Sequence, residues 1–102
     1  MNDLSADPHS ETIDMAITHR EFYRLWEKLH PPDTWNVEGQ TVRLGEVPPR
    51  VEVHLSDEYL PDFIPQIRLP RTILTFTFYG CEDDWREAFI KKFRLHFHRG
   101  GG

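Results

Sequence analysis

The chain has 102 residues, of which 38% are hydrophobic and 13% aromatic, and its formal net charge is -5. This length accommodates one domain with its own core and leaves no room for a second. The single cysteine, Cys81, excludes an intramolecular disulfide and a cysteine-based zinc site. No apolar run approaches the ~20 residues of a membrane span, and the acidic first residues lack a signal-peptide pattern. We therefore expect a cytoplasmic protein without membrane contact.

The N-terminal part predicts a tail followed by a short strand. Residues 1–11 are polar and acidic, which is typical of a disordered tail ahead of a single α+β domain over residues 12–99. Ile13, Met15 and Ile17 alternate with smaller or polar residues, and a period of two predicts a strand.

The segment from Thr18 to His30 predicts a helix. Thr18 and Glu21 have the spacing of a capping box, in which the hydroxyl of the first residue accepts from the backbone amide of the fourth. Four apolar side chains then recur at the spacing of one helical face: Phe22, Leu25, Trp26 and Leu29. Two prolines follow, and the residue before a proline disfavours helical backbone, so the helix ends near His30.

The middle of the chain predicts strands separated by loops. We expect a loop over residues 31–40, strands over 41–44 and 50–55, and a long strand region over 67–79 that contains a break at Pro70. Residues 56–65 form a loop, and its large apolar side chains are expected to plug one end of the core or, as the alternative, to form an exposed anchor patch. These side chains are Tyr59, Leu60, Phe63 and Ile64.

The C-terminal part predicts a helix and then a strand. Three acidic residues at 82–84 favour a helix start, because the helix dipole attracts negative charge there. From Phe93 the apolar residues alternate with Arg94, His96 and His98, which predicts a half-buried strand. Residues 100–102 are glycines and are expected to be a flexible end. The order is then βαββαβ, a ferredoxin-like two-layer sandwich with both helices on one face of an antiparallel sheet.

On that fold, a row of basic and imidazole side chains would lie on the sheet face that the helices leave open. This candidate interaction surface comprises Arg94, His96, His98, Arg99, Arg68 and Arg71. Open sheet faces and edges favour pairing with another chain. The leading hypothesis is a non-catalytic binding or regulatory module that binds a protein partner, or a second copy of itself, through this face.

Three other functions remain as alternatives. His96 and His98 project from one strand face, and with His54 they could hold a metal ion or an anion, although Arg94 would repel a cation. Cys81 could be a nucleophile at a helix start, but the acids after it oppose a thiolate. The arginines could contact nucleic acid, but the net acidity and the lack of a stacking motif disfavour it. No motif predicts a catalytic residue, a cofactor or a metal ligand set.

Overall fold

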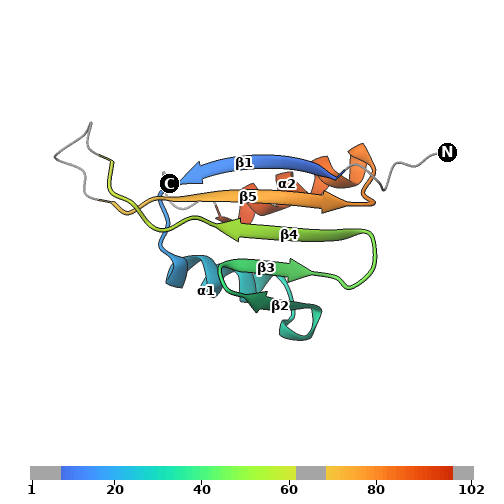
Figure 1. Cartoon of the computed structure of the whole chain (residues 1–102), viewed down its shortest axis with the longest axis horizontal. Coiled ribbons are helices and arrows are strands. Elements are labelled where there is room, and N and C mark those ends of the chain that lie inside the picture. The colour runs from blue at the N-terminus through green and yellow to red at the C-terminus, as the bar shows by residue number, and fades with distance from the viewer. Residues whose placement is uncertain (1–7, 62–68, 98–102) are drawn as a thin grey trace.

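The computed structural model describes residues 8–61 and 69–97. The elements in chain order are β1 (His9–Met15), α1 (His19–Leu29), a short 3-10 turn η2 (Pro32–Thr34), β2 (Trp35–Glu38), β3 (Thr41–Leu44), β4 (Arg50–Leu55), β5 (Thr72–Tyr79) and α2 (Asp83–Phe97). All strand pairs are antiparallel, and the spatial order is β1-β5-β4-β3-β2 (Figure 1). The fold class α+β agrees with the sequence-based prediction.

The ferredoxin-like order is wrong. The chain runs β-α-β-β-β-β-α, with a strand at 35–38 where we expected a loop and a helix at 93–97 where we expected a strand. The helix continues because Ile90, Phe93 and Phe97 are buried at a spacing of three and four residues. Leu95, which the strand pattern required to be buried, is 70% exposed.

Strand β2 forms because a tight turn folds it back onto β3. Glu38 lies opposite Thr41, which leaves Gly39 and Gln40 as a two-residue loop. Gly39 has a φ of 64°, the left-handed conformation that two-residue hairpin turns need at their first central position. The sheet gains an edge strand from this turn.

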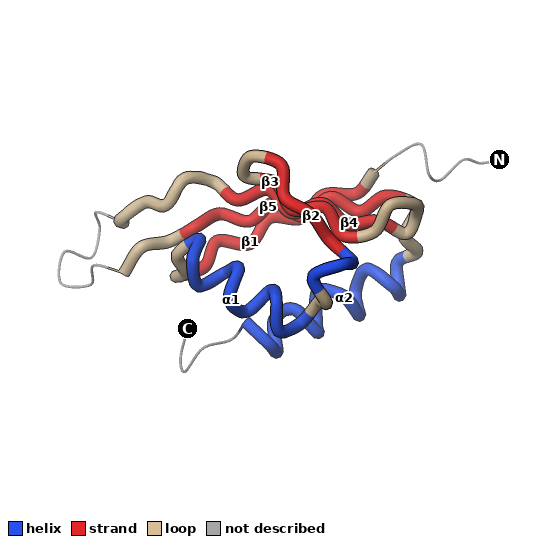
Figure 2. The backbone as a smooth tube through the Cα atoms, turned by 90° about the horizontal axis from the view of Figure 1, so that it is seen from below, coloured by secondary structure: helices blue, strands red, loops and turns tan. Residues whose placement is uncertain are grey.

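The two helices pack on the same face of the sheet, so the molecule has two layers (Figure 2). They run antiparallel to each other, since the ring of Phe22 near the start of α1 lies 5.4 Å from that of Phe97 at the end of α2, and the ring of His30 after α1 lies 5.9 Å from that of Phe89. The core between the layers is strongly aromatic. Its fully buried large side chains include Phe22, Trp26, Phe76, Phe78, Phe93 and Phe97.

The prediction for α1 is confirmed in detail. The Thr18 hydroxyl accepts a hydrogen bond of 3.1 Å from the Glu21 amide, and the helix ends at Leu29 before the two prolines. The N-terminal strand is longer than predicted, because β1 begins at His9 and so includes the last three residues of the segment assigned to the tail. In the part of the chain that the structure describes, neither helix has the length and apolar character needed to cross a bilayer.

Candidate functional site

Of the six residues of the candidate interaction surface, the structure describes three, and these three do not all lie on the open sheet face. Arg94 and His96 are exposed on α2, in the helix layer, and therefore cannot lie on the open sheet face. Arg71 does lie on the open side, just before β5. Arg68, His98 and Arg99 fall outside the described residues.

The open sheet face carries a different set of side chains, which strand alternation identifies. Thr72, Leu74, Phe76 and Phe78 of β5 are buried against the helices, so the alternate residues of β5 point the other way. The registers extend this assignment across all five strands. Hydroxyl side chains are frequent on this face, where β1, β5 and β3 contribute Ser10, Thr12, Thr75, Thr77 and Thr41, while the middle strand β4 contributes Arg50, Glu52 and His54.

Charged side chains of this face form two groups, one over β2 to β4 and one at β1, and within each group opposite charges pair. At the β2–β4 side, Arg43 lies 3.0 Å from Glu38 and 3.3 Å from Glu52. Arg50 lies 3.5 Å from the same Glu52 carboxylate, and its guanidinium carbon lies 4.3 Å from the centre of the Tyr79 ring. The arginines of this side therefore have partners within the face itself.

At the β1 side, Asp14 holds the loop that connects β4 to β5. Arg71 donates to the Asp14 carboxylate at 3.0 Å and to its backbone carbonyl at 3.1 Å, and the Tyr59 hydroxyl donates to the other carboxylate oxygen. Partial burial by itself raises the pKa of Asp14, but the hydrogen bonds from Tyr59 and Arg71 outweigh it and lower the pKa. Tyr59 and Leu60 are 37% and 47% exposed, so the prediction that they plug the core is wrong, while Phe63 and Ile64 lie outside the described residues.

Counted over the described residues, the charged side chains of the open face cancel. They are the acids Asp14, Glu38 and Glu52 and the arginines Arg43, Arg50 and Arg71. Three negative and three positive charges sum to zero. A face with no net charge and frequent hydroxyl side chains does not provide the basic surface that a phosphate backbone requires.

Two of the three histidines of the alternative metal site lie far from each other in the fold. His54 lies on the open sheet face, whereas His96 lies on α2 on the other side of the sheet, and His98 falls outside the described residues. Within residues 8–61 and 69–97, no group of three histidine, cysteine, aspartate or glutamate side chains could hold a metal ion. His54 instead pairs with the Thr41 hydroxyl at 3.1 Å.

The environment of Cys81 does not favour a nucleophilic thiolate. Burial raises the pKa of the thiol, and this outweighs its contacts with the backbone carbonyls of Arg50 and Tyr79, at 3.8 and 3.5 Å, and the charge of Arg86. The thiol packs against the core as a small apolar group.

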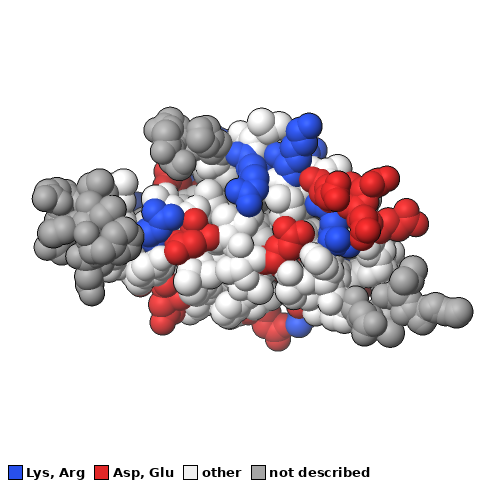
Figure 3. Space-filling view, turned by 90° about the horizontal axis from the view of Figure 1, so that it is seen from above, with Lys and Arg blue, Asp and Glu red and all other residues white. Residues whose placement is uncertain are grey.

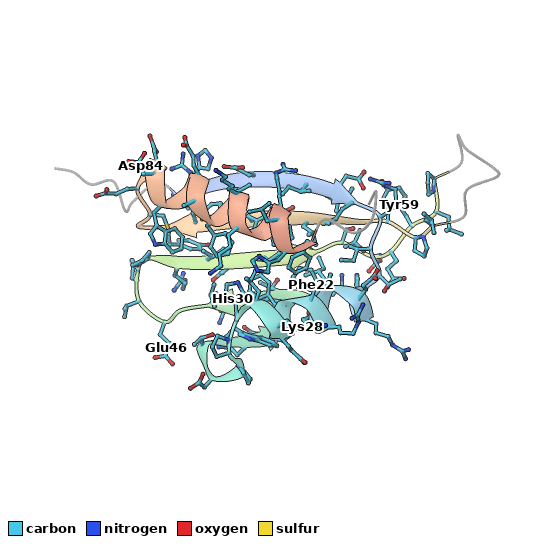
Figure 4. The ribbon with its side chains drawn as sticks, turned by 180° about the vertical axis from the view of Figure 1, so that it is seen from behind. Phe22, Lys28, His30, Glu46, Tyr59 and Asp84 are labelled. Atoms are coloured by element: carbon cyan, nitrogen blue, oxygen red, sulfur yellow. The ribbon has the colours of Figure 1, made fainter. Side chains whose placement is uncertain are left out.

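One imidazole, which no sequence pattern singled out, lies between the two helices. The His30 ring centre lies 4.3 Å from that of Trp26 and 5.9 Å from that of Phe89, and its Nε2 atom is buried without a hydrogen-bond partner (Figure 4). Burial, together with the positive charges of the nearby Lys92 and His96, lowers the pKa of His30 to about 4. The half-buried ring therefore favours its neutral form and packs as an aromatic side chain at the border of the core.

Comparison with known proteins adds no family. No protein-family model matches the chain, and no significant match is found among curated proteins or solved structures. The function must therefore be argued from the surface itself.

Proposed function

We propose that this protein is a non-catalytic interaction module and that it binds a protein partner through the open face of its sheet. The observation that carries the proposal is the distribution of charge on that face. Along β5 the face presents uncharged side chains, and the charged groups on β1 to β4, including Glu52 on the middle strand, are already paired with one another. Protein interfaces likewise combine uncharged contact area with polar groups whose hydrogen bonds and charges are satisfied.

The uncharged side chains of the face suit a protein partner. Along β5 the open face presents Ile73, Thr75, Thr77 and Tyr79, all of them partly exposed, and Thr12 of β1 is fully on the surface. Threonine methyl groups and the tyrosine ring supply apolar contact, while the hydroxyls can donate and accept hydrogen bonds. A nucleic acid or a metal ion would need charge that this face lacks.

The test is a capture experiment with three proteins: the wild type, Thr75→Arg on the β5 part of the face, and Lys28→Glu on the exposed side of α1. Lys28 points away from the sheet (Figure 4), so this variant controls for a change of surface charge. Each captured protein is then purified, and its direct affinity for the three chains is measured by calorimetry.

We expect a partner that binds the wild type and Lys28→Glu equally and binds Thr75→Arg at least about tenfold more weakly, because an arginine within the interface buries a new charge. Equal melting temperatures of the three proteins exclude unfolding as the cause. Equal binding by all three would refute the open face as the site, and loss only with Lys28→Glu would move the site to the helix layer.

A further inference from the structure

The sheet has two edges, and within the described residues no strand or loop pairs with the longer one. Strand β1 has seven residues at this edge, against four in β2 at the other. Its pairing with β5 runs from His9 to Met15 without a bulge, and the strand contains no proline or lysine. Of the devices that block sheet edges it has an inward-pointing charge, Glu11, and Arg86 lies 4.0 Å from that carboxylate. In Figure 1 no described element lies beyond β1 in the plane of the sheet.

The register shows which backbone groups of β1 face outward. The amide and carbonyl of Ile73 both bond to Ser56, on the β4 side of β5. Ile73 is the partner of Asp14 on β1, so this is a pair without mutual hydrogen bonds, and the backbone groups of Asp14 point away from the sheet. By alternation, the amides and carbonyls of Ser10 and Thr12 point outward as well.

From this geometry we propose that two copies of the chain pair through β1, antiparallel and about a twofold axis at Thr12, to form a continuous ten-stranded sheet. In this register Thr12 lies opposite its own copy and Ser10 lies opposite Asp14 of the partner. All three outward residues of each copy then exchange backbone hydrogen bonds. The Asp14 carbonyl, which already accepts from Arg71, has a second lone pair for this contact.

The side chains also select this register. On the helix side, Ile13 lies opposite Glu11 of the partner, so no like charges meet. An axis at Glu11 would place two carboxylates directly opposite each other, which destabilises a strand pair. An axis at Ile13 would leave Ser10 unpaired and form fewer hydrogen bonds. Apart from His9, Glu11 is the only titratable residue of β1 that points toward the helices. Arg86 lies 4.0 Å from the Glu11 carboxylate.

The charge pattern of α2 fits the same dimer. The first turns of α2 carry Asp83, Asp84 and Glu87, and its later turns carry Lys91, Lys92 and Arg94. Arg86 reaches Glu11, so α2 lies beside β1. A twofold axis at Thr12 makes the two α2 helices antiparallel neighbours, with acidic turns facing basic ones. In Figure 3, seen from the β1 side, acidic side chains gather at one end, basic ones lie beside them, and much of the remaining surface is uncharged.

The proposal is independent of the partner that binds the open face, and its test is the mass of the full chain in solution. Sedimentation over a range of concentrations should give a dimer of twice 12.1 kDa for the wild type. In Thr12→Pro the dimer dissociation constant should rise at least about tenfold, because the central hydrogen bonds are lost. The fold should survive, since the Thr12 amide is not used within the sheet.

A matched control exists at the other edge. In β2 the register and alternation place the amide of Val37 outward, away from β3, so Val37→Pro also loses an outward amide of an edge strand. We expect this variant to remain dimeric. A second variant, Thr12→Lys, keeps the backbone donor and places two ammonium groups opposite each other at the axis, and it should also become monomeric.

Amide exchange measured by NMR locates the contact. The Thr12 amide should be protected in the wild-type dimer and should exchange freely in Thr12→Lys. A wild type that stays monomeric at all concentrations, or a dimer that is unchanged in both Thr12 variants, overturns the proposal. A dimer in which the Thr12 amide exchanges freely overturns it as well.

Discussion

The enclosed histidine makes the stability of this protein sensitive to mild acid. The pKa of His30 is about 4 in the folded chain, while a histidine in an unfolded chain has its ordinary pKa of 6.5. Between these values the unfolded state binds a proton that the folded state does not. The free energy of unfolding therefore decreases as the pH falls from about 6.5 to about 4, and it is restored as the pH rises.

The size of the effect follows from the two pKa values. Without solvent screening, the free energy of unfolding would decrease by about 2 kcal/mol between pH 7 and pH 5, since one pKa unit corresponds to about 1.4 kcal/mol. His30 is only about half buried, and solvent reduces the interaction, so we expect about 1 kcal/mol. For a chain of this length, that is a decrease of the melting temperature of roughly 5 °C.

The assay compares the wild type with His30→Phe. Phenylalanine keeps an aromatic ring between Trp26 and Phe89 but cannot be protonated. From pH 7 to pH 5, the free energy of unfolding of the variant should therefore decrease by about 1 kcal/mol less than that of the wild type. Denaturant unfolding at both pH values gives these differences, and His54→Gln controls for the removal of a surface imidazole. Parallel pH dependence of wild type and His30→Phe would refute the reasoning, as would an NMR titration of His30 near its ordinary pKa.

The remaining predictions concern the local structure. Thr18→Ala should destabilise the chain by about 1 kcal/mol in denaturant unfolding, because it removes the helix cap. Leu95→Glu should change stability by less than about 0.5 kcal/mol, whereas Phe97→Ala should cost about 3–5 kcal/mol; a large loss of stability in Leu95→Glu as well would mean that this segment is a strand. Gly80→Ala should lower the melting temperature, because Gly80 has a φ of 65° and a methyl group there would lie 2.5 Å from Pro48 Cβ.

The sequence correctly predicts those elements whose own residue pattern matches the burial of their side chains in the structure. The Thr18 cap, the apolar face of α1 and the alternation in β4 and β5 all reflect contacts within one element, and the structure has each of them. Strand β2 was missed although its signal was present. In β2 the apolar Trp35 and Val37 alternate with Asn36 and Glu38, and Gly39-Gln40 supplies a two-residue turn, but four residues are too short a run to predict a strand from alternation alone.

The error at the C-terminus has a different cause. Phe93, Leu95 and Phe97 fit a strand period, while Phe89, Phe93 and Phe97 fit a helix period, and the sequence alone does not say which apolar residue is exposed. The strand interpretation placed Arg94 and His96 on the sheet face, whereas the structure has both on α2. The real open face could not be assigned without the registers, because hydroxyl-rich strands carry no motif.

The area of the open face connects the two proposals. Five strands spaced about 4.8 Å apart, with a mean length of about 20 Å, present a face of roughly 400 Å². A stable protein interface buries about 800 Å² on each partner, so one face is about half of what such a contact needs. Pairing through β1 would place two open faces side by side on the same surface of a ten-stranded sheet, because the twofold axis is perpendicular to that sheet. A partner that spans the axis then contacts about 800 Å², which is why self-association at the edge would strengthen binding at the face.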